Sequence, residues 1–437
     1  MMESKGLYLI DAEQGYTMEQ AVAEAKRCLN CKNPTCITGC PIENHIPEFI
    51  KEVSKGNFGE AREILARKTN LPAICGRVCP HDLQCEGHCI LAKAGKEIKI
   101  GKLERFVADF DHSMGLINEK IPRKTRGKVA VIGSGPAGLT IAGDLAKDGF
   151  NVVVYEALPE PGGILLYGIP DFRLQKDVVR REIAKIASYG VTFMNKMVGG
   201  EDFTVDTLFE RGFDAIFIGT GTNVSNNLDI PGKELHGIEL SSYFLRTSML
   251  ANEGKLNSEE VIVKEGDRVI VIGGGNVAMD AARTAVRIGA KEVSVVYRRD
   301  EEDMPASKLE YEDARSENVR FRFRNTPVEY IGREGKVTGL KVKTDTGEEI
   351  LETNVVLVAI GSKPARRIVS TTEGIEVDEK GYVITREKPY GMCTLKGVFA
   401  GGDVVHQPAT VVLAMKEAKK VAEGIAAYVD AKKLLDL

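Results

Sequence analysis

The sequence contains no run of about 18 apolar residues, which is the length that a membrane-spanning helix requires. Its first residues, MMESKGLYLIDAEQ, also lack the basic stretch followed by an apolar stretch that marks a secretory signal. Neither sign of charge dominates, because 59 lysines and arginines face 63 aspartates and glutamates, for a net charge of -4. This balance argues against a nucleic-acid groove or a surface for anionic membranes. We therefore expect a cytoplasmic protein that binds neither nucleic acid nor membrane.

Hydrophobic residues make up 43% of the 437 residues, which is enough to build the cores of two or three domains of ordinary size. This content rules out intrinsic disorder as the main state. Glycine is frequent, with 45 residues, where about 7% of a chain is typical. So many glycines indicate tight backbone turns.

Cysteines are almost confined to one stretch of the chain. Eight of the nine fall between Cys28 and Cys89, and the ninth is Cys393. A disulfide scaffold is typical of a short secreted chain, which this is not, so metal binding is the better interpretation.

Residues 1–120 show apolar residues at helical spacing and no convincing strand. The predicted helices lie in four segments: 21–29, 45–56, 58–68 and 100–110. From Lys128 the pattern changes to strand, glycine turn, helix and strand, and the same order recurs from Arg268. Two such units indicate an α/β fold with two Rossmann-like dinucleotide-binding domains after the helical domain.

We predict that the second dinucleotide-binding domain is inserted into the first. The helical domain would span residues 1–120, with a linker near 113–127. The first dinucleotide-binding domain would comprise 121–235 and 365–437, and the second would comprise 236–364.

The first glycine turn follows a strand and opens a helix, and it reads Gly133-Ser134-Gly135-Pro136-Ala137-Gly138. In such a turn the first glycine bends the chain, the second lets backbone approach a pyrophosphate, and the third lets helix pack on strand. The helix N-terminus favours the negative charge of the phosphates. Glu156 ends the next strand, where a carboxylate accepts hydrogen bonds from a ribose diol. This context favours dinucleotide binding over a purely structural turn.

Two further glycine segments indicate which dinucleotide binds. Pro161-Gly162-Gly163 follows Glu156, and Gly401-Gly402-Asp403 precedes the last helix of the chain. Small residues at both places would let backbone pass close to an extended ligand. A dinucleotide touched by both ends of the domain would be FAD. Taken alone, the turn at Gly402 is equally consistent with a structural role.

The second glycine turn reads Gly273-Gly274-Gly275-Asn276-Val277-Ala278. The strand after it ends in Arg298-Arg299 instead of an acid. Two guanidinium groups would hold a 2′-phosphate that a carboxylate would repel, which favours NADPH over NADH. The alternative is that both arginines belong to a solvated surface.

The cysteine block has irregular spacing, Cys28-x2-Cys31-x4-Cys36-x3-Cys40-Pro41 and then Cys75-x3-Cys79-Pro80-x4-Cys85-x3-Cys89. A proline after a closing cysteine is typical of ferredoxins in which the last cysteine serves the other cluster. Eight thiolates would suit two four-iron clusters. Zinc is the alternative, although four-thiolate zinc sites usually have regular knuckles. A flavin disulfide reductase is improbable, because no redox cysteine pair follows Gly163.

Together these motifs resemble the family of the small (beta) subunit of NADPH-dependent glutamate synthase. Its relatives include the flavin and NAD(P)H subunit of dihydropyrimidine dehydrogenase and the large subunit of ferredoxin:NADP oxidoreductases. The resemblance covers nearly the whole chain. It rests on the cysteine block, IGKLERF, VIGSGPAGL, PGGILLYGIPDFRL, VIVIGGGNVAMDAARTAVRIGA, VVYRRDEEDMPAS, VAIGSKP and VFAGGD.

The resemblance implies two sets of cluster ligands. One 4Fe-4S cluster would be held by Cys28, Cys31, Cys36 and Cys89, and the other by Cys40, Cys79, Cys85 and Glu104. Cys75 would then not be a ligand. A carboxylate ligand is expected to lower the potential of its cluster relative to a neutral ligand.

The resemblance also implies the dinucleotide sites. The flavin site would comprise Gly133, Ser134, Pro136, Ala137, Glu156, Gly163, Arg173, Gly402, Asp403, Thr410 and Val411, with Gly135, Gly138 and Gly162 in the same turns. The NADP site would comprise Gly275, Asn276, Val277, Arg298 and Arg299, with Gly273 and Ala278 in the same turn, and Gly361 belongs to the VAIGSKP motif. One departure is Glu417, which stands where relatives usually have glycine.

The function implied is that of an oxidoreductase subunit with FAD, NADPH and two 4Fe-4S clusters. Electrons would pass from NADPH through the flavin and the clusters to a partner. We expect a large catalytic subunit, because the predicted domains include no catalytic barrel or amidotransferase. Glutamate synthase is preferred, and dihydropyrimidine dehydrogenase or ferredoxin-linked transhydrogenation are alternatives. A zinc-clamped, non-redox interaction subunit is an alternative of another class.

Overall fold

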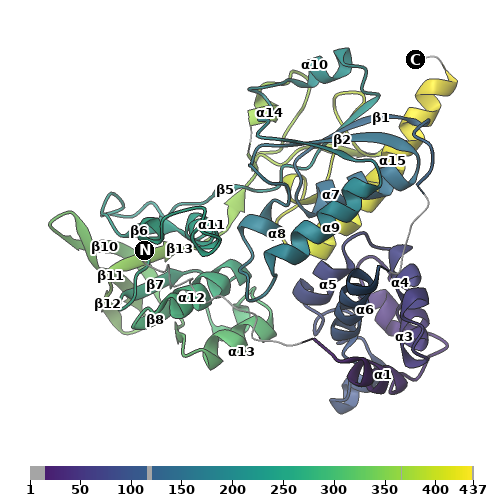
Figure 1. Ribbon diagram of the computed structural model, residues 1–437. Coiled ribbons are helices and arrows are strands. Elements are labelled where there is room, and N and C mark those ends of the chain that lie inside the picture. Colours follow the sequence, from purple (N-terminus) through teal and green to yellow (C-terminus); the bar gives the residue numbers. More distant parts are fainter. Residues whose placement is uncertain (1–14, 116–120, 366, 436–437) are drawn as a thin grey trace, which may run out of the picture. The chain divides into compact units, whose positions relative to one another are not determined.

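The computed structural model describes residues 15–115, 121–365 and 367–435. These residues form two compact units (Figure 1). The first unit comprises residues 167–173 and 224–362, and the second comprises the described residues before 167, 174–223 and those after 362. The domain boundaries stay a prediction, and part of the expected linker 113–127 lies outside the described residues.

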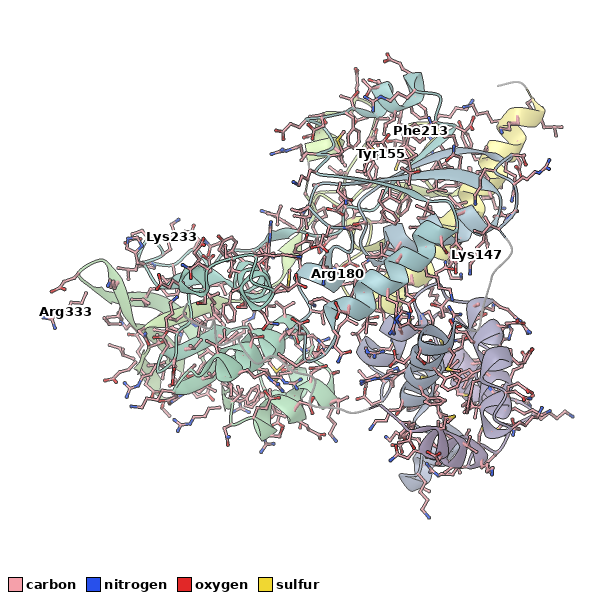
Figure 2. The ribbon with its side chains drawn as sticks, viewed as in Figure 1. Lys147, Tyr155, Arg180, Phe213, Lys233 and Arg333 are labelled. Carbon is pink, nitrogen blue, oxygen red and sulfur yellow. The ribbon has the colours of Figure 1, made fainter. Side chains whose placement is uncertain are left out.

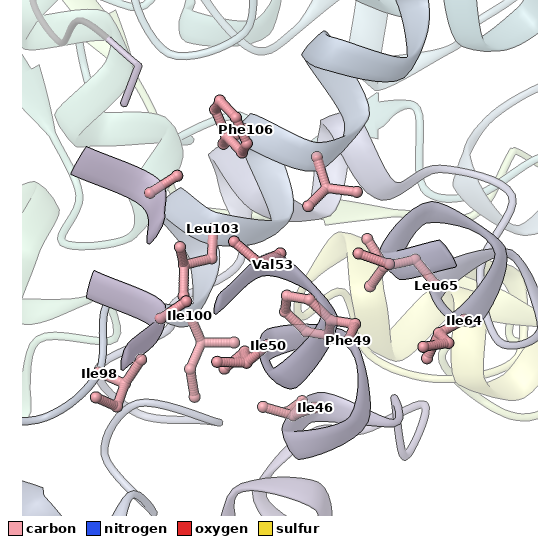
Figure 3. Packing of buried hydrophobic residues seen from close by; sticks show 14 of the residues in the cluster. Ile46, Phe49, Ile50, Val53, Ile64, Leu65, Ile98, Ile100, Leu103 and Phe106 are labelled. Carbon is pink, nitrogen blue, oxygen red and sulfur yellow. The ribbon is translucent and has the colours of Figure 1, made fainter. Parts of the chain in front are cut away.

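The N-terminal part of the second unit is helical, as predicted. Its elements are α1 (Met18–Lys26), α2 (Thr35–Gly39), α3 (Ile46–Ser54), α4 (Phe58–Ala66), α5 (Pro72–Val78), η1 (Ile90–Ala94) and α6 (Ile100–Met114). The four predicted helices correspond to α1, α3, α4 and α6, with ends that differ by a few residues. Their apolar faces form one buried core that includes Phe49, Ile50, Leu65 and Leu103 (Figure 3).

Helix α5 was not predicted from the sequence. It packs against α6 at a point where Gly76 removes a side chain from the contact, because a Cβ there would lie 2.5 Å from the backbone nitrogen of Arg105. The close approach of the two helix backbones therefore positions α5. No periodic pattern of apolar residues in the sequence predicts this helix. The helix matters for the site because it carries Cys75 and ends next to Cys79.

A seven-stranded sheet forms the α/β part of the second unit, in the order β15-β16-β17-β4-β1-β2-β3. Its strands are β1 (Gly127–Ile132), β2 (Phe150–Glu156), β3 (Thr192–Asn195), β4 (Ala215–Ile218), β15 (Thr385–Glu387), β16 (Tyr390–Cys393) and β17 (Val398–Ala400). Strand β1 pairs in parallel with β2 and β4, and β4 pairs in parallel with β17. The C-terminal segment thus completes the sheet, which confirms the predicted insertion of one domain into the other.

Helices α7 (Pro136–Lys147), α9 (Lys176–Ser188) and α15 (Val411–Leu434) lie beside this sheet, and α7 packs against α15 (Figure 1). The shorter helices of this part are α8 (Ile164–Tyr167), α10 (Val205–Glu210), α14 (Arg367–Ser370) and η4 (Gly402–Val404). Aromatic side chains fill part of its core: the ring centroid of Tyr155 lies 4.7 Å from that of Phe203 and 6.2 Å from that of Phe213 (Figure 2).

The first unit is built on a five-stranded parallel sheet in the order β6-β13-β7-β8-β9. Its elements are β5 (Val224–Ser225), β6 (Ile238–Leu240), α11 (Ser241–Asn252), η2 (Ser258–Glu260), β7 (Arg268–Ile272), α12 (Asn276–Ile288), β8 (Glu292–Val296), η3 (Glu301–Asp303), α13 (Lys308–Ser316), β9 (Arg320–Arg322), β10 (Thr326–Arg333), β11 (Lys336–Thr344), β12 (Gly347–Glu352) and β13 (Val355–Val358), with β14 (Ser362–Lys363) at its end. Strands β10, β11 and β12 form a separate antiparallel sheet that the sequence analysis did not predict.

Residues 167–173 fold with the first unit, whereas the sequence analysis placed them in the chain of the flavin domain. The physical reason is that two arginines of the first unit make cation–π contacts with the ring of Phe172. The guanidinium carbons of Arg283 and Arg287 lie 4.7 and 4.2 Å from the centroid of its ring.

The described helices include none that is both long enough and apolar enough to cross a membrane.

Candidate cofactor sites

The first glycine turn lies between β1 and α7, as predicted. Gly133 has a φ of +99°, a region that favours glycine. A Cβ on Gly138 would lie 2.0 Å from the carbonyl oxygen of Gly133, so only glycine lets α7 approach the strand this closely. The turn places the N-terminus of α7 at the carboxyl end of β1, where doubly wound folds bind their ligands.

Three chain segments meet at this turn. The backbone N–H of Ser134 donates to the Glu156 carboxylate at 3.0 Å, and the Ser134 hydroxyl donates to the same oxygen. The N–H of Gly162 donates to the Ser134 hydroxyl oxygen at 2.9 Å. Gly402 has a φ of +73°, and a Cβ there would lie 2.9 Å from the Cβ of Ala137. The structure thus brings together the glycine turn, its acid and both later glycine segments.

Open space adjoins the N-terminus of α7. Gly135 is the N-cap residue, and no side chain caps the helix. Among the described residues, no atom other than those of its chain neighbours lies within 4 Å of a Cβ built on Gly135. A Cβ on Gly163 would lie 2.9 Å from the Cα of Gly135, which keeps the opposite wall free of side chains. A pyrophosphate can therefore reach the helix N-terminus, and the residues fit a dinucleotide.

Asp403 and the start of α15 complete the predicted flavin residues. Burial raises the pKa of Asp403 to about 6, and the positive charge of His406 opposes this shift. Its carboxylate would therefore gain from hydroxyl donors on a ligand. Thr410 is the N-cap of α15, where its hydroxyl accepts a hydrogen bond from the N–H of Leu413 at 3.3 Å, and Val411 is the first helical residue.

The second glycine turn has the same architecture between β7 and α12. Gly273 has a φ of +139°, and a Cβ there would lie 2.2 Å from the carbonyl oxygen of Ala359. Gly275 is the N-cap of α12, and the nearest atom to a Cβ on it would be Cγ of Pro305 at 3.9 Å. This turn therefore also leaves room for a phosphate at a helix N-terminus.

Of the three residues after Gly275, two contact the rest of the protein and one is exposed to solvent. The Asn276 side-chain oxygen accepts a hydrogen bond from the N–H of Ser307 at 3.0 Å. Ala278 is fully buried, whereas Val277 is 40% exposed. Val277 therefore lies on the side of the turn that is open to a ligand.

Arg298 and Arg299 are exposed just beyond the end of β8. The guanidinium carbon of Arg299 lies 5.5 Å from the centroid of the Tyr297 ring. Both arginines follow the second strand of the unit. In a Rossmann unit, the residues that bind the ribose lie at this position. Exposure alone fits both a 2′-phosphate site and a solvated surface.

Arg173 and Gly361 lie in the first unit. The Arg173 guanidinium is paired with Asp280 at 2.9 Å and with Glu310 at 2.6 Å. Gly361 has a φ of +92°, and its carbonyl oxygen accepts the N–H of Asn226 at 2.9 Å. Arg173 is thus held by carboxylates of the second nucleotide-binding domain, and its predicted flavin contact stays a prediction.

Four of the predicted cluster ligands line one pocket in the helical domain. Cys28, Cys31, Cys36 and Cys89 share a pocket of about 390 Å³, including its open mouth, with apolar side chains such as that of Ile100. Burial raises the pKa of Cys36 to about 11, and the charges of Cys28 and Cys89 add to this shift. The fold therefore brings Cys89 to the cysteines at the start of the block.

The remaining predicted ligands form a second set around Glu104. Burial raises the pKa of Cys40 to about 12, and the charge of Glu104 contributes. The pKa of Cys79 is raised first by a hydrogen bond with Cys75, and that of Cys85 first by burial, and Glu104 adds to both shifts. Glu104 thus lies within electrostatic reach of all three thiols.

The carboxyl group of Glu104 has few hydrogen-bond partners among the described residues. Burial raises its pKa to about 8, with a contribution from Glu182, and Arg62 opposes the shift. Within the described chain its Oε1 atom is buried without a hydrogen-bond partner. A metal ion would satisfy such an oxygen and displace the protons of the buried thiols, so both sets fit a metal cluster.

Among the residues that the structure describes, no three Cys, His, Asp or Glu side chains lie close enough together to hold a single metal ion. The two sets are thus spread more widely than the ligands of a mononuclear zinc site.

Sequence reasoning missed two charged residues next to the second set. Arg62 of α4 is 2% exposed, and its Nε donates to the Asp111 carboxylate at 3.1 Å. Burial raises the pKa of Glu182 on α9 to about 6, and Arg62 opposes the shift. In the sequence, each of them is a charged residue next to the apolar face of a helix. Such residues are usually exposed to solvent, so the pattern does not predict that these two are buried.

Two family models match the chain. The model described as "Dihydroprymidine dehydrogenase domain II, 4Fe-4S cluster" matches residues 8–116. The model described as "Pyridine nucleotide-disulphide oxidoreductase" matches residues 127–418, which is more than half of the chain. The first coincides with the helical domain and the cysteine block, and the second spans both glycine turns.

Comparison with individual proteins identifies the family more closely. The glutamate synthase [NADPH] small chain of Halomonas elongata is 39% identical, and the match covers 95% of this chain and 92% of that protein. The one of Escherichia coli is 36% identical over 97% of this chain and 94% of that protein. The chain belongs to the glutamate synthase small chain family. The NAD-dependent dihydropyrimidine dehydrogenase subunit PreT of Escherichia coli is also similar, at 33% identity over 97% of this chain and 98% of that protein.

Solved structures share the fold of the α/β part. FprA from Mycobacterium tuberculosis, in complex with NADPH, has a TM-score of 0.58 at 20% identity and covers 71% of this chain and 86% of its own. Thioredoxin reductase from T. acidophilum has a TM-score of 0.54 at 21% identity and covers 68% of this chain and 97% of its own.

As a member of the glutamate synthase small chain family, the chain is an oxidoreductase. The family models support iron-sulfur and flavin-type cofactors together with a pyridine nucleotide. They contradict the zinc-clamped, non-redox alternative, because the matched helical domain is a 4Fe-4S domain. The shared fold of thioredoxin reductase does not by itself bring a cysteine-pair chemistry, since eight of the nine cysteines lie in the cysteine block and Cys393 alone follows Gly163.

Glu417, which stands where the resemblance implies a glycine, lies within an unbroken helix. Its carboxylate accepts a hydrogen bond from the hydroxyl of Tyr390 and lies 3.4 Å from Nε2 of His406. Helix α15 runs unbroken from Val411 to Leu434. Polar partners on a neighbouring strand and loop thus accommodate the larger side chain.

Proposed function

We propose that this chain is the NADPH-oxidising small subunit of a glutamate synthase. It would pass electrons from NADPH through FAD and two 4Fe-4S clusters to a large catalytic subunit. The observation that carries the proposal is the sorting of the predicted ligands into two sets, one lining a pocket and one around Glu104. A chain with two glycine turns and two such sets has the parts of an electron-transfer subunit.

We assign each cofactor to the residues that the resemblance indicates. The first cluster would be bound by Cys28, Cys31, Cys36 and Cys89, and the second by Cys40, Cys79, Cys85 and Glu104. FAD would lie in the domain formed by residues 121–235 and 365–437, and NADPH in the domain formed by 236–364. The helical domain of residues 1–120 would carry both clusters.

The protein's own part is alignment and insulation. When bound, the flavin accepts hydride from NADPH and releases electrons singly, and the clusters carry one electron each. Gly135 and Gly275 would admit the phosphates of the two dinucleotides at helix N-termini. The apolar lining of the cysteine pocket, with Ile46 and Ile100, would limit the access of water to the first set. No side chain of the chain needs to act as an acid or base.

The partner is proposed from the relatives' names. A glutamate synthase small chain implies a large chain, which would hold the site of amino-acid chemistry. Iron-sulfur ligands must be reduced thiols, so we also propose the cytoplasm as the location.

A second function has its own support. The subunit PreT of dihydropyrimidine dehydrogenase matches this chain from end to end at 33% identity. The same electron-transfer chain would then serve a pyrimidine-reducing partner. Ferredoxin-linked transhydrogenation, with ferredoxin as partner, is the remaining alternative.

Cofactor analysis tests the electron-transfer assignment. We expect anaerobically purified protein to contain one FAD and about eight irons with as much acid-labile sulfide per chain. NADPH should bleach the visible absorbance of the flavin. Flavin without iron, or iron without flavin, would contradict the proposal.

Identification of the partner separates the candidate functions. The native protein would be captured under anaerobic conditions, and the chains that co-purify would be identified by mass. A large subunit with a glutaminase domain supports glutamate synthesis, whereas a pyrimidine-binding barrel supports the second function. A small flavin and iron-sulfur subunit would instead indicate ferredoxin-linked transhydrogenation.

A further inference from the structure

The segment that leads into α13 faces the second glycine turn. The Cγ atom of Pro305 lies 3.9 Å from a Cβ built on Gly275, the N-cap of α12. The N–H of Ser307, the N-cap of α13, donates to the side-chain oxygen of Asn276 at 3.0 Å. The space for a phosphate at the N-terminus of α12 therefore depends on how far α13 lies from α12.

One arginine contacts both helices. Nη1 of Arg173 donates to the two carboxylate oxygens of Asp280 at 2.9 Å, and Asp280 lies on α12 one turn after Asn276. Nε of Arg173 lies 2.6 Å from Oε1 of Glu310, which lies on α13 one turn after Ser307. The three charged side chains are between 6% and 12% exposed. Each carboxylate is thus buried, and each lies one helical turn from the phosphate space.

The guanidinium group fixes the distance between these carboxylates. Asp280 and Glu310 would repel each other without the positive charge of Arg173 between them. Nη1 of Arg283 supports Glu310 further by donating to its other carboxylate oxygen at 3.0 Å. The donors of a guanidinium lie in one plane at fixed angles, whereas the ammonium group of a lysine lacks this fixed geometry. The planar group of Arg173 therefore determines how α12 and α13 are spaced.

The contacts of Arg173 differ from those that the resemblance implies. Arg173 follows the flavin glycine segment in sequence and lies outside the predicted nucleotide-binding range 236–364. It nevertheless folds with the first unit, where the adjacent Phe172 packs on the guanidinium groups of Arg283 and Arg287. Its carboxylate partners belong to the helix that opens at the second glycine turn and to the helix that follows it.

We propose that Arg173 is a positioning residue for the NADPH site, which sets the width of the phosphate space over Gly275 by holding α12 and α13 at a fixed spacing. The inference rests on the proposed function, because it requires a dinucleotide at the second glycine turn. NADPH and NADH share the pyrophosphate that binds at such a turn. The role of Arg173 therefore concerns both nucleotides alike, whereas a residue that binds the 2′-phosphate concerns NADPH alone.

Binding measurements on the full-length holoprotein test this role. Arg173→Lys keeps the charge and loses the planar geometry, and Asp280→Asn keeps the shape of the partner and loses its charge. Arg287→Lys is the matched control, because Arg287 lies near the C-terminal end of α12 and pairs with Glu317 at 2.7 Å. Titration calorimetry gives the dissociation constants of NADP+ and NAD+, and flavin titration of the apoprotein gives that of FAD. Circular dichroism verifies that each variant is folded.

We expect Arg173→Lys and Asp280→Asn to weaken the binding of NADP+ and of NAD+ by the same factor, at least about fivefold, because small displacements of binding groups have large effects. The affinity for FAD should not change. The double variant should bind little more weakly than either single variant, since both weaken the same pair. In steady-state kinetics, the Michaelis constants should rise while kcat stays within about twofold. Arg287→Lys should match the wild type.

Several outcomes would overturn the inference alone. Weaker FAD binding with unchanged nucleotide binding would assign Arg173 to the flavin site, and weaker binding of NADP+ alone would assign it to the 2′-phosphate. Unchanged binding of all three ligands, or an equal loss in Arg287→Lys, would show that Arg173 does not set the spacing. If Arg173→Lys fails to fold, the same outcomes for Asp280→Asn decide.

The wild type separates this inference from the proposed function. Wild-type protein that binds neither NADP+ nor NAD+ would overturn the proposed function itself.

Discussion

At the residue scale, two glycines of the first glycine turn have different surroundings. Gly138 is needed for packing, because a side chain there would collide with the carbonyl oxygen of Gly133 at 2.0 Å. Gly135 has no such packing role, because a Cβ there meets no atom of the described residues within 4 Å apart from those of its chain neighbours. Gly138 thus serves the fold, and we expect Gly135 to serve the ligand.

Substitution of these glycines should separate the two effects. Gly138→Ala is expected to lower the free energy of unfolding by about 1–3 kcal/mol, as overpacking does. Gly135→Ala should leave that free energy unchanged and weaken FAD binding at least about tenfold, which equals about 1.4 kcal/mol. Denaturant unfolding and flavin titration of the apoprotein measure both quantities.

Gly59→Ala serves as the control, because Gly59 lies in α4, outside the glycine turns. Beyond its own helix backbone and chain neighbours, a Cβ on Gly59 also meets no atom of the described residues within 4 Å. A loss of flavin affinity in this variant, or full affinity in Gly135→Ala, would contradict the assignment.

The two exposed arginines after β8 test the choice of nucleotide. If Arg298 and Arg299 hold the 2′-phosphate, replacing both with Ala should raise the Michaelis constant for NADPH at least about tenfold, because hydrogen bonds to charged groups contribute about 1.5–3 kcal/mol. The constant for NADH should stay nearly the same. Steady-state kinetics with an artificial electron acceptor gives both constants, and equal changes for the two nucleotides would favour the solvated-surface interpretation.

At the scale of elements, two aspartates of α6 attach the helical domain to α9. Asp109 pairs with Arg77 at 2.7 Å and with Arg181 at 2.5 Å. Asp111 pairs with Arg62 at 3.1 Å and with Lys185 at 3.2 Å. Since Arg181 and Lys185 both belong to α9, these partly buried charge pairs join the helical domain to the flavin domain.

Glu182, on the same face of α9, should make stability depend on pH. Burial raises its pKa from 4.5 to about 6, so its contribution to stability is complete below pH 4.5 and is lost as pH rises through about 6. Relative to Glu182→Gln, which does not titrate, the wild type should lose about 2 kcal/mol of unfolding free energy across this window. Denaturant unfolding of both proteins at several pH values measures the difference. A difference that is constant with pH would show that Glu182 is not the titrating group.

For the whole molecule, the cysteine block and the glycine turns are separable parts of one electron path. The proposed cluster ligands belong to the helical domain, whereas each glycine turn belongs to an α/β sheet. Hydride transfer between nicotinamide and flavin is cofactor chemistry and needs no group from the helical domain.

Removing one ligand set should therefore spare the first step. In a Cys28→Ser, Cys89→Ser double variant we expect the iron content to fall by about half, with flavin reduction by NADPH within about twofold of the wild-type rate. Electron delivery to the partner should fall at least about tenfold. Anaerobic rapid mixing measures the first rate and partner-coupled turnover the second, with Cys393→Ser as control. Slower flavin reduction in the double variant alone would show that the two parts are not separable.

The sequence predicted those features that depend on neighbours along the chain. The strands at Lys128 and Arg268, their glycine turns and the four apolar-patterned helices of the first domain all have short-range signatures, and the structure contains each of them. Helix α5 and the antiparallel sheet of β10, β11 and β12 lacked such signatures. Gly76 shows why for α5, because that helix is placed by its contact with α6.

The sequence by itself thus determined two glycine turns that open helices and one block of closely spaced cysteines, and these predict the kinds of sites. Only the tertiary structure decided which residues meet. It brought Cys89 to the pocket of Cys28, brought Gly402 to Ala137 through the C-terminal segment, held Arg173 against Asp280, and placed Cys75 against Met415. The physical reason is that a turn or a ligand type is encoded in a few adjacent residues. Contacts between distant residues depend instead on how whole helices and sheets pack and on the entropy of closing the chain between them.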